Sequence, residues 1–99
     1  MTSYTSKTYT AALEEAAADW DWLDGALCAE FLFADFNQAF AFMQQVAELA
    51  EKQQHHPDWQ NSYNRVVISL RTHDQDAVTG LDVALAKQIS MLYTRFKQP

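Results

Sequence analysis

The spacing of apolar residues changes several times along the chain between the periods of a helix and of a strand. Residues 8–18 are rich in Ala, Glu and Leu, which favour a short helix. From Trp20 to Phe33, apolar side chains then alternate with polar or smaller ones, as in strands. The dipeptide Asp24-Gly25 interrupts this alternation and suits the two left-handed positions of a type I′ turn. This stretch therefore predicts a short helix followed by a β-hairpin.

The next segment has the pattern of a long amphipathic helix. Asp35 and Gln38 have the spacing of a capping box at its start. Pro57 disfavours helical geometry at His56, so we expect the helix to end near residues 52–54. Apolar residues recur every three or four positions and predict the stripe that faces the core: Phe36, Phe40, Met43, Val46, Ala47 and Ala50.

Residues 59–63 and 65–72 predict a second hairpin, with Asn64 at its turn. One face of its second strand carries Val66, Ile68 and Leu70. Thr79 and Asp82 then have the spacing of another capping box. A last helical stripe follows them: Leu81, Leu85, Ile89, Leu92 and Phe96.

The resulting order, α-β-β-α-β-β-α, predicts the fold class α+β. Hairpins form antiparallel sheets, and the apolar helix stripes need a sheet face to cover. We expect a two-layer sandwich in which helices cover one face of a four-stranded antiparallel sheet. No linker or repeat divides the chain, so residues 1–99 are interpreted as a single domain. Exposed edge strands are either protected or paired with a second subunit, which favours a homo-oligomer.

Composition narrows the function classes. The 99 residues are 48% hydrophobic and 20% charged, which is typical of a globular protein. The formal net charge is −6 with scattered Lys and Arg, whereas direct nucleic-acid binding needs a basic face. No apolar run approaches the ~18 residues of a membrane span, and no hydrophobic signal core is present. The single Cys28 cannot form an internal disulfide. We expect a cytoplasmic protein without membrane contact.

The candidate chemistry lies with the histidines, which occur only at positions 55, 56 and 73. Histidine can donate or accept a proton near neutral pH. His55 and His56 fall in the loop after the long helix, where Pro57 restricts the backbone, and His73 falls just past the last strand. Because a rigid frame presents loops at such positions, we expect proton chemistry there. Two carboxylates could orient the imidazoles. Asp74 directly follows His73, and Glu51 lies about one helical turn before His55 and His56.

Two other interpretations of the histidines stay open. Each could be an ordinary polar residue with a hydrogen-bond partner. The three could also bind zinc, but adjacent histidines are poorly spaced for two ligands, and the i, i+4 pair of H-E-x-x-H is absent. We therefore predict no metal site.

The chain also resembles a known family. The run from Glu51 through His55-His56-Pro57 and Trp59 to Thr72-His73 is similar to the signature of the pterin-4a-carbinolamine dehydratases. The likeness extends upstream through residues 31–43 and downstream through the T-x-x-D of residues 79–82. It covers roughly residues 20–92.

This resemblance implies a β2-α-β2-α fold with an added N-terminal helix. It implies a lyase that converts 4a-hydroxytetrahydropterin into quinonoid dihydropterin and water. The reaction recycles the cofactor of aromatic amino-acid hydroxylases, so phenylalanine hydroxylase would be a partner. The family needs no metal and no separate cofactor, since the pterin is the substrate. Its members are dimers or tetramers in which sheets join across subunits.

The resemblance also assigns residues. The catalytic positions would be His55, His56, His73 and Glu51. The substrate-binding positions would be His55, His56, Pro57, Trp59, Thr72, His73, Asp74 and Gln75. We expect His56 and His73 to handle the leaving hydroxyl and the N5 proton, and Glu51 to hold one imidazole. His55 would orient the ring or exchange roles with the other two histidines. The chain departs from the family at Gln54, often acidic, and at Ala77-Val78, often Gly-Leu, which should affect the rate and pH optimum.

Two other functions would use the same fold. Some dehydratase-like proteins are non-catalytic protein-binding or dimerisation modules, or assembly factors of other enzymes. Such assembly factors tend to lose the histidine pattern, and this chain keeps all three histidines and Glu51. A role in handling pterins of molybdenum-cofactor pathways would use the same pocket with another ligand.

Overall fold

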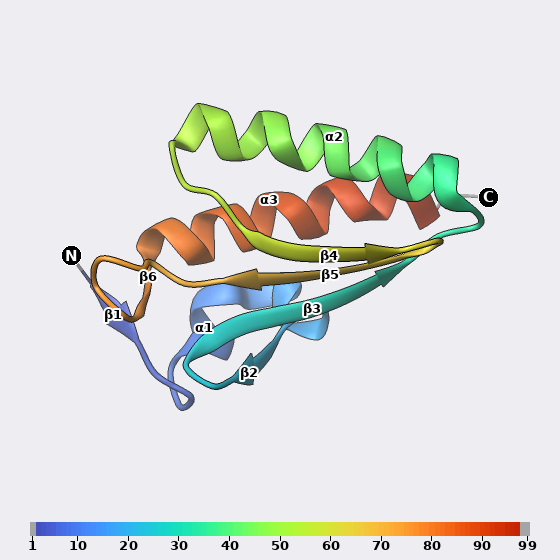
Figure 1. Ribbon diagram of the computed structural model, residues 1–99. Helices are drawn as coiled ribbons and strands as arrows, with labels where there is room; N and C mark the ends of the chain where they lie inside the picture. The colour runs from blue at the N-terminus through green and yellow to red at the C-terminus, as the bar shows by residue number, and fades with distance from the viewer. Residues whose placement is uncertain (1, 98–99) are drawn as a thin grey trace.

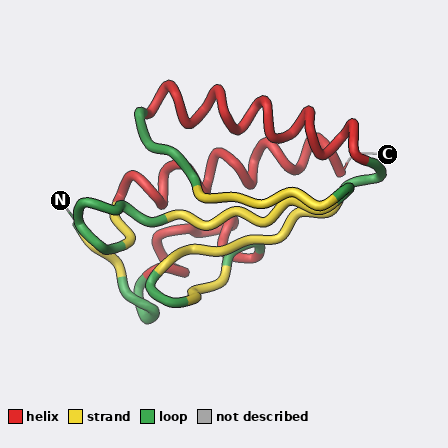
Figure 2. Tube along the Cα trace, viewed as in Figure 1, coloured by secondary structure: helices red, strands yellow, loops and turns green. Residues whose placement is uncertain are grey.

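Two β-hairpins form one antiparallel sheet with long helices packed on one face in the computed structural model, which describes residues 2–97 (Figure 1). The strands are β2 (Asp21–Leu23), β3 (Ala26–Leu32), β4 (Asp58–Ser62) and β5 (Arg65–Leu70). Their order in the sheet is β2-β3-β5-β4. The long helices, α2 (Phe36–Gln53) and α3 (Gly80–Lys97), lie on the same side of the strands (Figure 2). The predicted α+β sandwich is confirmed.

The turns of the two hairpins follow the prediction in one case and differ in the other. Asp24 and Gly25 both have left-handed φ angles, 52° and 74°, as a type I′ turn requires. In the second turn the left-handed residue is Tyr63, with φ 51°, and not Asn64. Asn64 instead uses its side-chain amide to donate a hydrogen bond to the Phe33 carbonyl at 3.0 Å. This bond ties the second turn to the end of β3.

The core lies between the sheet and the helices. Alternate residues of β3 and β5 face it in register, with Ala29 opposite Ile68 and Phe31 opposite Val66. Deep in the same core, the Trp20 indole donates to the Ser90 hydroxyl at 2.9 Å, so its polar atom is satisfied. From α3, the buried residues include Leu85, Ile89 and Leu92, as predicted.

The predicted stripe of α2 is wrong at Phe36, Phe40 and Ala47, which are exposed. Phe36 and Phe40 are 45% and 48% exposed. The buried residues of α2 are Ala39, Phe42, Val46 and Ala50. Two adjacent apolar lanes run along this helix and only one can face the sheet. The lane with Phe42 does so, because its ring packs against Phe31 and Phe33 at centroid distances of 5.2 and 4.9 Å. The predicted helix end is confirmed, since α2 stops at Gln53 and Gln54 is left-handed.

The N-terminal part contains features that the pattern did not predict. The helix expected over residues 8–18 is divided into α1 (Tyr9–Leu13) and a 3-10 turn, η1 (Glu14–Ala18). Two short strands, β1 (Ser3–Tyr4) and β6 (Val78–Thr79), form a separate antiparallel pair. None of the helices between residues 2 and 97 has the length and hydrophobicity needed to cross a bilayer.

Candidate active site

Each of the three histidines bonds to a different carboxylate. His55 Nε2 lies 2.5 Å from Asp82 Oδ1, and His56 Nε2 lies 2.5 Å from Glu51 Oε2. His73 Nε2 lies 3.1 Å from the carboxylate of Asp58. The His55 side chain is 10% exposed and its partner 0%, whereas the side chains of the other two pairs are more than half exposed. The site therefore combines one buried and two exposed pairs.

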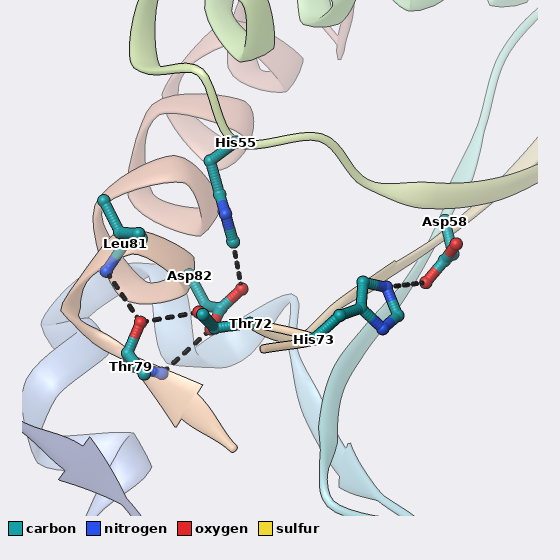
Figure 3. Close-up of polar contacts among 7 residues, drawn as sticks. All are labelled: His55, Asp58, Thr72, His73, Thr79, Leu81 and Asp82. Carbon is teal, nitrogen blue, oxygen red and sulfur yellow. Dashed lines mark hydrogen bonds and ion pairs between the residues drawn. The ribbon is translucent and has the colours of Figure 1, made fainter. Parts of the chain in front are cut away.

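The end of α2 directs His55 toward the start of α3. Gln54 takes a left-handed conformation that ends the helix. The His55 backbone N–H then donates to the Ala50 carbonyl at 3.1 Å, which keeps the chain close to the last turn. From there the imidazole points down to Asp82 in the first turn of α3 (Figure 3).

Asp82 is held by a network of buried hydrogen bonds (Figure 3). Its Oδ2 accepts from the Thr72 hydroxyl and from the Thr79 backbone N–H, each at 2.8 Å. The hydroxyl oxygens of Thr72 and Thr79 are 2.6 Å apart. Because Thr72 has already given its proton to Asp82, Thr79 is the donor between them, and its own oxygen accepts from the Leu81 N–H at 3.3 Å. The hydrogen bonds of Leu81, Thr79 and Thr72 therefore form one chain of donors that ends on the Asp82 carboxylate.

This network selects the form of the His55 ring. With the carboxylate ionised, both of its oxygens are acceptors, so Nε2 of His55 carries a proton and donates it to Oδ1. The neutral ring then keeps the lone pair on Nδ1. No buried side-chain nitrogen or oxygen in residues 2–97 lacks a hydrogen-bond partner. The buried pair is thus a satisfied polar cluster that holds one imidazole in one orientation.

The exposed pairs come from other elements. Glu51 lies on the last turn of α2 and reaches His56 in the following loop, which is the contact expected from the sequence. His73 lies in the turn after β5, which is closed by hydrogen bonds between the backbones of Thr72 and Ala77 at 2.9 and 3.4 Å. The carboxylate on His73 comes from Asp58, and not from the adjacent Asp74 that the sequence indicated.

Asp58 also borders a hollow on the helix-free face of the sheet. It lies opposite Ser69 in the register, and Trp59 lies opposite the buried Ile68, so the two neighbours face opposite sides. Trp59 packs against the core from the helix side. The hollow has a volume of about 290 Å³ and is lined by Leu23, Asp24, Ala26, Cys28, Asp58, Ser69 and Arg71.

The predicted site residues gather from two loops. His55, His56 and Pro57 belong to the α2–β4 loop, and residues 72–75 to the end of β5 and its turn. In Figure 3, His55 reaches from the first loop toward Asp82 and Thr72, while the His73 ring points the other way, toward Asp58. In the described part of the chain, hydrogen bonds join each imidazole to a carboxylate and not to another imidazole.

The same region shows what sequence reasoning missed. Asp82 was identified only as a helix cap, yet the cap occupies one of its oxygens and leaves the other for His55. Asp58 was not assigned a role at all. Within residues 2–97, no group of three His, Cys, Asp or Glu side chains is arranged to hold a metal ion.

The sandwich and the two histidine-bearing loops define an α+β protein with a candidate site for proton transfer. The family described as pterin 4 alpha carbinolamine dehydratase matches residues 2–92, and the chain belongs to this family. A protein of Mesorhizobium japonicum, whose name assigns it provisionally to the pterin-4-alpha-carbinolamine dehydratases, is 52% identical over 83 residues. That match covers 82% of this chain and 84% of the relative. The relatives' names agree with the enzyme class predicted from the sequence.

Two solved structures share the fold. One is described as a transcriptional coactivator/pterin dehydratase from Brucella melitensis. It has a TM-score of 0.85 and 38% identity, over 93% of this chain and 99% of that one. The other is described as a pterin dehydratase-like protein identified as a RuBisCO assembly factor in the alpha-carboxysome. With a TM-score of 0.62 and 23% identity, over 75% of this chain and 86% of that one, it shows a common fold alone.

Proposed function

We propose that the chain dehydrates 4a-hydroxytetrahydropterin to quinonoid dihydropterin, with its histidines as the acid and base. Family membership supports the substrate class. The structural observation that carries the proposal is the pairing of every histidine with its own carboxylate in two neighbouring loops. Ordinary surface histidines have no need of such partners, whereas proton-transferring ones gain orientation and a defined tautomer from them.

The reaction needs one acid and one base. The C4a–O bond breaks and the hydroxyl leaves as water, which requires a proton from an acid. The N5–H bond also breaks, its electron pair forms the C4a=N5 double bond, and a base takes the proton. The base then holds an extra proton and the acid lacks one. Both return to their starting state when the base releases its proton to water and the acid takes one up. A positioned acid or base typically contributes ~10²–10⁴-fold to the rate.

Exposure supports a division of roles among the histidines. The His56 and His73 side chains are 58% and 61% exposed, so both can exchange protons with water between turnovers. They would handle the leaving hydroxyl and the N5 proton, with Glu51 and Asp58 orienting them. His55 is buried and held at one angle, which fits a group that orients the pterin ring. The substrate-binding assignment of Pro57, Trp59, Thr72, Asp74 and Gln75 remains part of the proposal.

The test is an absorbance assay for the quinonoid product, with carbinolamine generated by a hydroxylase as substrate. His56→Ala and His73→Ala should each lower kcat/KM at least about tenfold. Gln60→Ala, an exposed change on β4, is the matched control and should leave the rate unchanged. Full activity in both histidine variants would refute the assignment.

Several wider properties belong to the same proposal. The enzyme would act in the cytoplasm without a metal or separate cofactor and would recycle pterin for a phenylalanine hydroxylase. It would form a homodimer or homotetramer, since β2 and β4 are the edges of the sheet. Light scattering on the purified protein tests the oligomer, and metal analysis of the active protein tests the absence of a metal.

A second candidate, a protein-binding module or assembly factor, is favoured by one observation. Phe36 and Phe40 are stacked at a centroid distance of 5.9 Å on the outer side of α2, where they are nearly half exposed. Exposed apolar side chains of this kind are common where proteins associate. If association is the main function, Phe36→Ser with Phe40→Ser will abolish it, and the histidine variants will have no effect in any assay.

A further inference from the structure

A short N-terminal strand is joined to the segment that carries the buried network. Strand β1 pairs with β6, with Ser3 opposite Thr79 and Tyr4 opposite Val78. In Figure 1 this pair lies apart from the main sheet, at the end where α3 begins. β6 follows directly on the turn that contains His73 and precedes the first residue of α3. β1 therefore pairs with the short segment that connects the His73 turn to α3.

Thr79 of β6 is the residue on which the network depends. It is fully buried. Its N–H donates to Asp82 Oδ2, and its hydroxyl lies 2.6 Å from that of Thr72. A displacement of Thr79 would withdraw one donor from Asp82 and the hydroxyl that donates to Thr72, so the carboxylate that holds His55 would lose part of its own support.

β1 is itself anchored, so it can hold β6 in place. A two-residue strand has little stability alone. The Tyr4 side chain, however, is partly buried and packs against the core. Directly after it, the Thr5 N–H donates to the Thr8 hydroxyl at 2.9 Å, and the Thr5 carbonyl accepts from the Tyr9 N–H at 3.1 Å. These contacts fix the start of the chain to α1.

We propose that β1 is a positioning segment of the site: by pairing with β6 it holds Thr79 where Thr72 and Asp82 can fix the His55 imidazole. The proposal rests on the proposed function only for its effect on catalysis. Its effect on His55 can be observed without substrate.

The first experiment measures the His55 ring directly. In ¹⁵N-labelled protein, the Nε2–H of His55 should exchange slowly with water because it donates to a buried carboxylate, and His55→Gln identifies its signal. In a variant that lacks residues 2–4, exchange of this proton should be at least about tenfold faster, because the local opening that exposes it becomes easier. His56 and His73 serve as internal references, since their partners are exposed.

Matched variants separate strand pairing from general destabilisation. Val46→Ala lowers core stability on α2, which does not pair with β6, and should not reproduce the change at His55. Tyr4→Ala removes the core packing that anchors β1 but keeps its backbone, so it should speed exchange at His55 less than the deletion does. In an antiparallel pair, opposite residues alternate between hydrogen-bonded and non-hydrogen-bonded positions, so only one of Ser3→Pro and Tyr4→Pro removes a paired N–H. These two variants should therefore differ in the exchange rate of the His55 Nε2–H. If the deletion variant fails to fold, this comparison tests the inference in its place.

Activity supplies the second readout. The deletion should lower kcat at least about threefold with little change in KM, since an imidazole is misplaced while the binding loops remain. If the wild-type protein has no dehydratase activity, the proposed function fails, and the exchange measurement still decides this inference. Unchanged exchange at His55 in the deletion variant, or an equal change in Val46→Ala, would overturn the inference.

Discussion

Replacing Asp82 with Ala removes the acceptor shared by three donors: the His55 ring, the Thr72 hydroxyl and the Thr79 N–H. A buried donor without an acceptor costs about 1–3 kcal/mol. Three such donors give a loss of about 3–9 kcal/mol. Whole domains are stable by only about 5–15 kcal/mol, so the variant should be close to unfolding.

Asp82→Asn separates the charge from the hydrogen bonds. Its carbonyl oxygen can still accept from Thr72 and Thr79, while its NH₂ faces His55 Nε2. The ring must then adopt the other tautomer, with the proton on Nδ1. The loss of stability should be about 1 kcal/mol, whereas kcat should fall at least about tenfold if His55 orients the substrate.

Urea unfolding of the two variants and the wild type measures these differences at constant m value. Asp74→Ala is the matched control, because this aspartate is exposed, and it should change stability by less than about 0.5 kcal/mol. The reasoning fails if Asp82→Ala and Asp82→Asn unfold within about 1 kcal/mol of each other, since both would then leave the donors equally satisfied.

Three further outcomes follow. Phe42→Ala should cost about 3–5 kcal/mol in urea unfolding and Phe40→Ala less than about 1 kcal/mol; equal losses would show that the α2 lanes are misassigned. Thr72→Val should cost about 1–2 kcal/mol, because the hydroxyl between Thr79 and the buried carboxylate is lost, and a neutral result would contradict the network. The hydrogen bond and charge of Lys87 lower the pKa of Glu14, so this pair stabilises the fold above the ordinary pKa of a glutamate and ceases to do so as the pH falls through the lowered value. Glu14→Gln should therefore shift the urea midpoint more at neutral pH than at a pH well below the ordinary pKa of a glutamate, and a shift of equal size at both would exclude this linkage.

The fold was largely readable from the sequence because the two periods and the first turn dipeptide are local properties. Asp24-Gly25 needs no tertiary partner to favour a type I′ turn, and both of its φ angles are as expected. The lane of α2 that faces the sheet depends instead on how Phe42 fits between rings from β3. β1 was missed because a two-residue strand has no period.

The candidate site was readable only in part, for a similar reason. The histidines and Glu51 lie within one local run, and the Glu51–His56 contact spans a single helical turn. The partners of the other two histidines lie 27 and 15 residues away and depend on how α3 and β4 pack. A carboxylate in a capping box gives no sign in the sequence that its second oxygen meets an imidazole.

The central claim is that the histidines of this chain catalyse the loss of water from a pterin carbinolamine. The most direct measurement is the rate of quinonoid dihydropterin formation with the wild-type protein and with the double variant His56→Ala/His73→Ala, at equal concentration. The wild type should exceed the uncatalysed rate at least about a hundredfold, and the double variant should fall to within about tenfold of it. A wild-type rate equal to the uncatalysed one, or a double variant as fast as the wild type, would contradict the account.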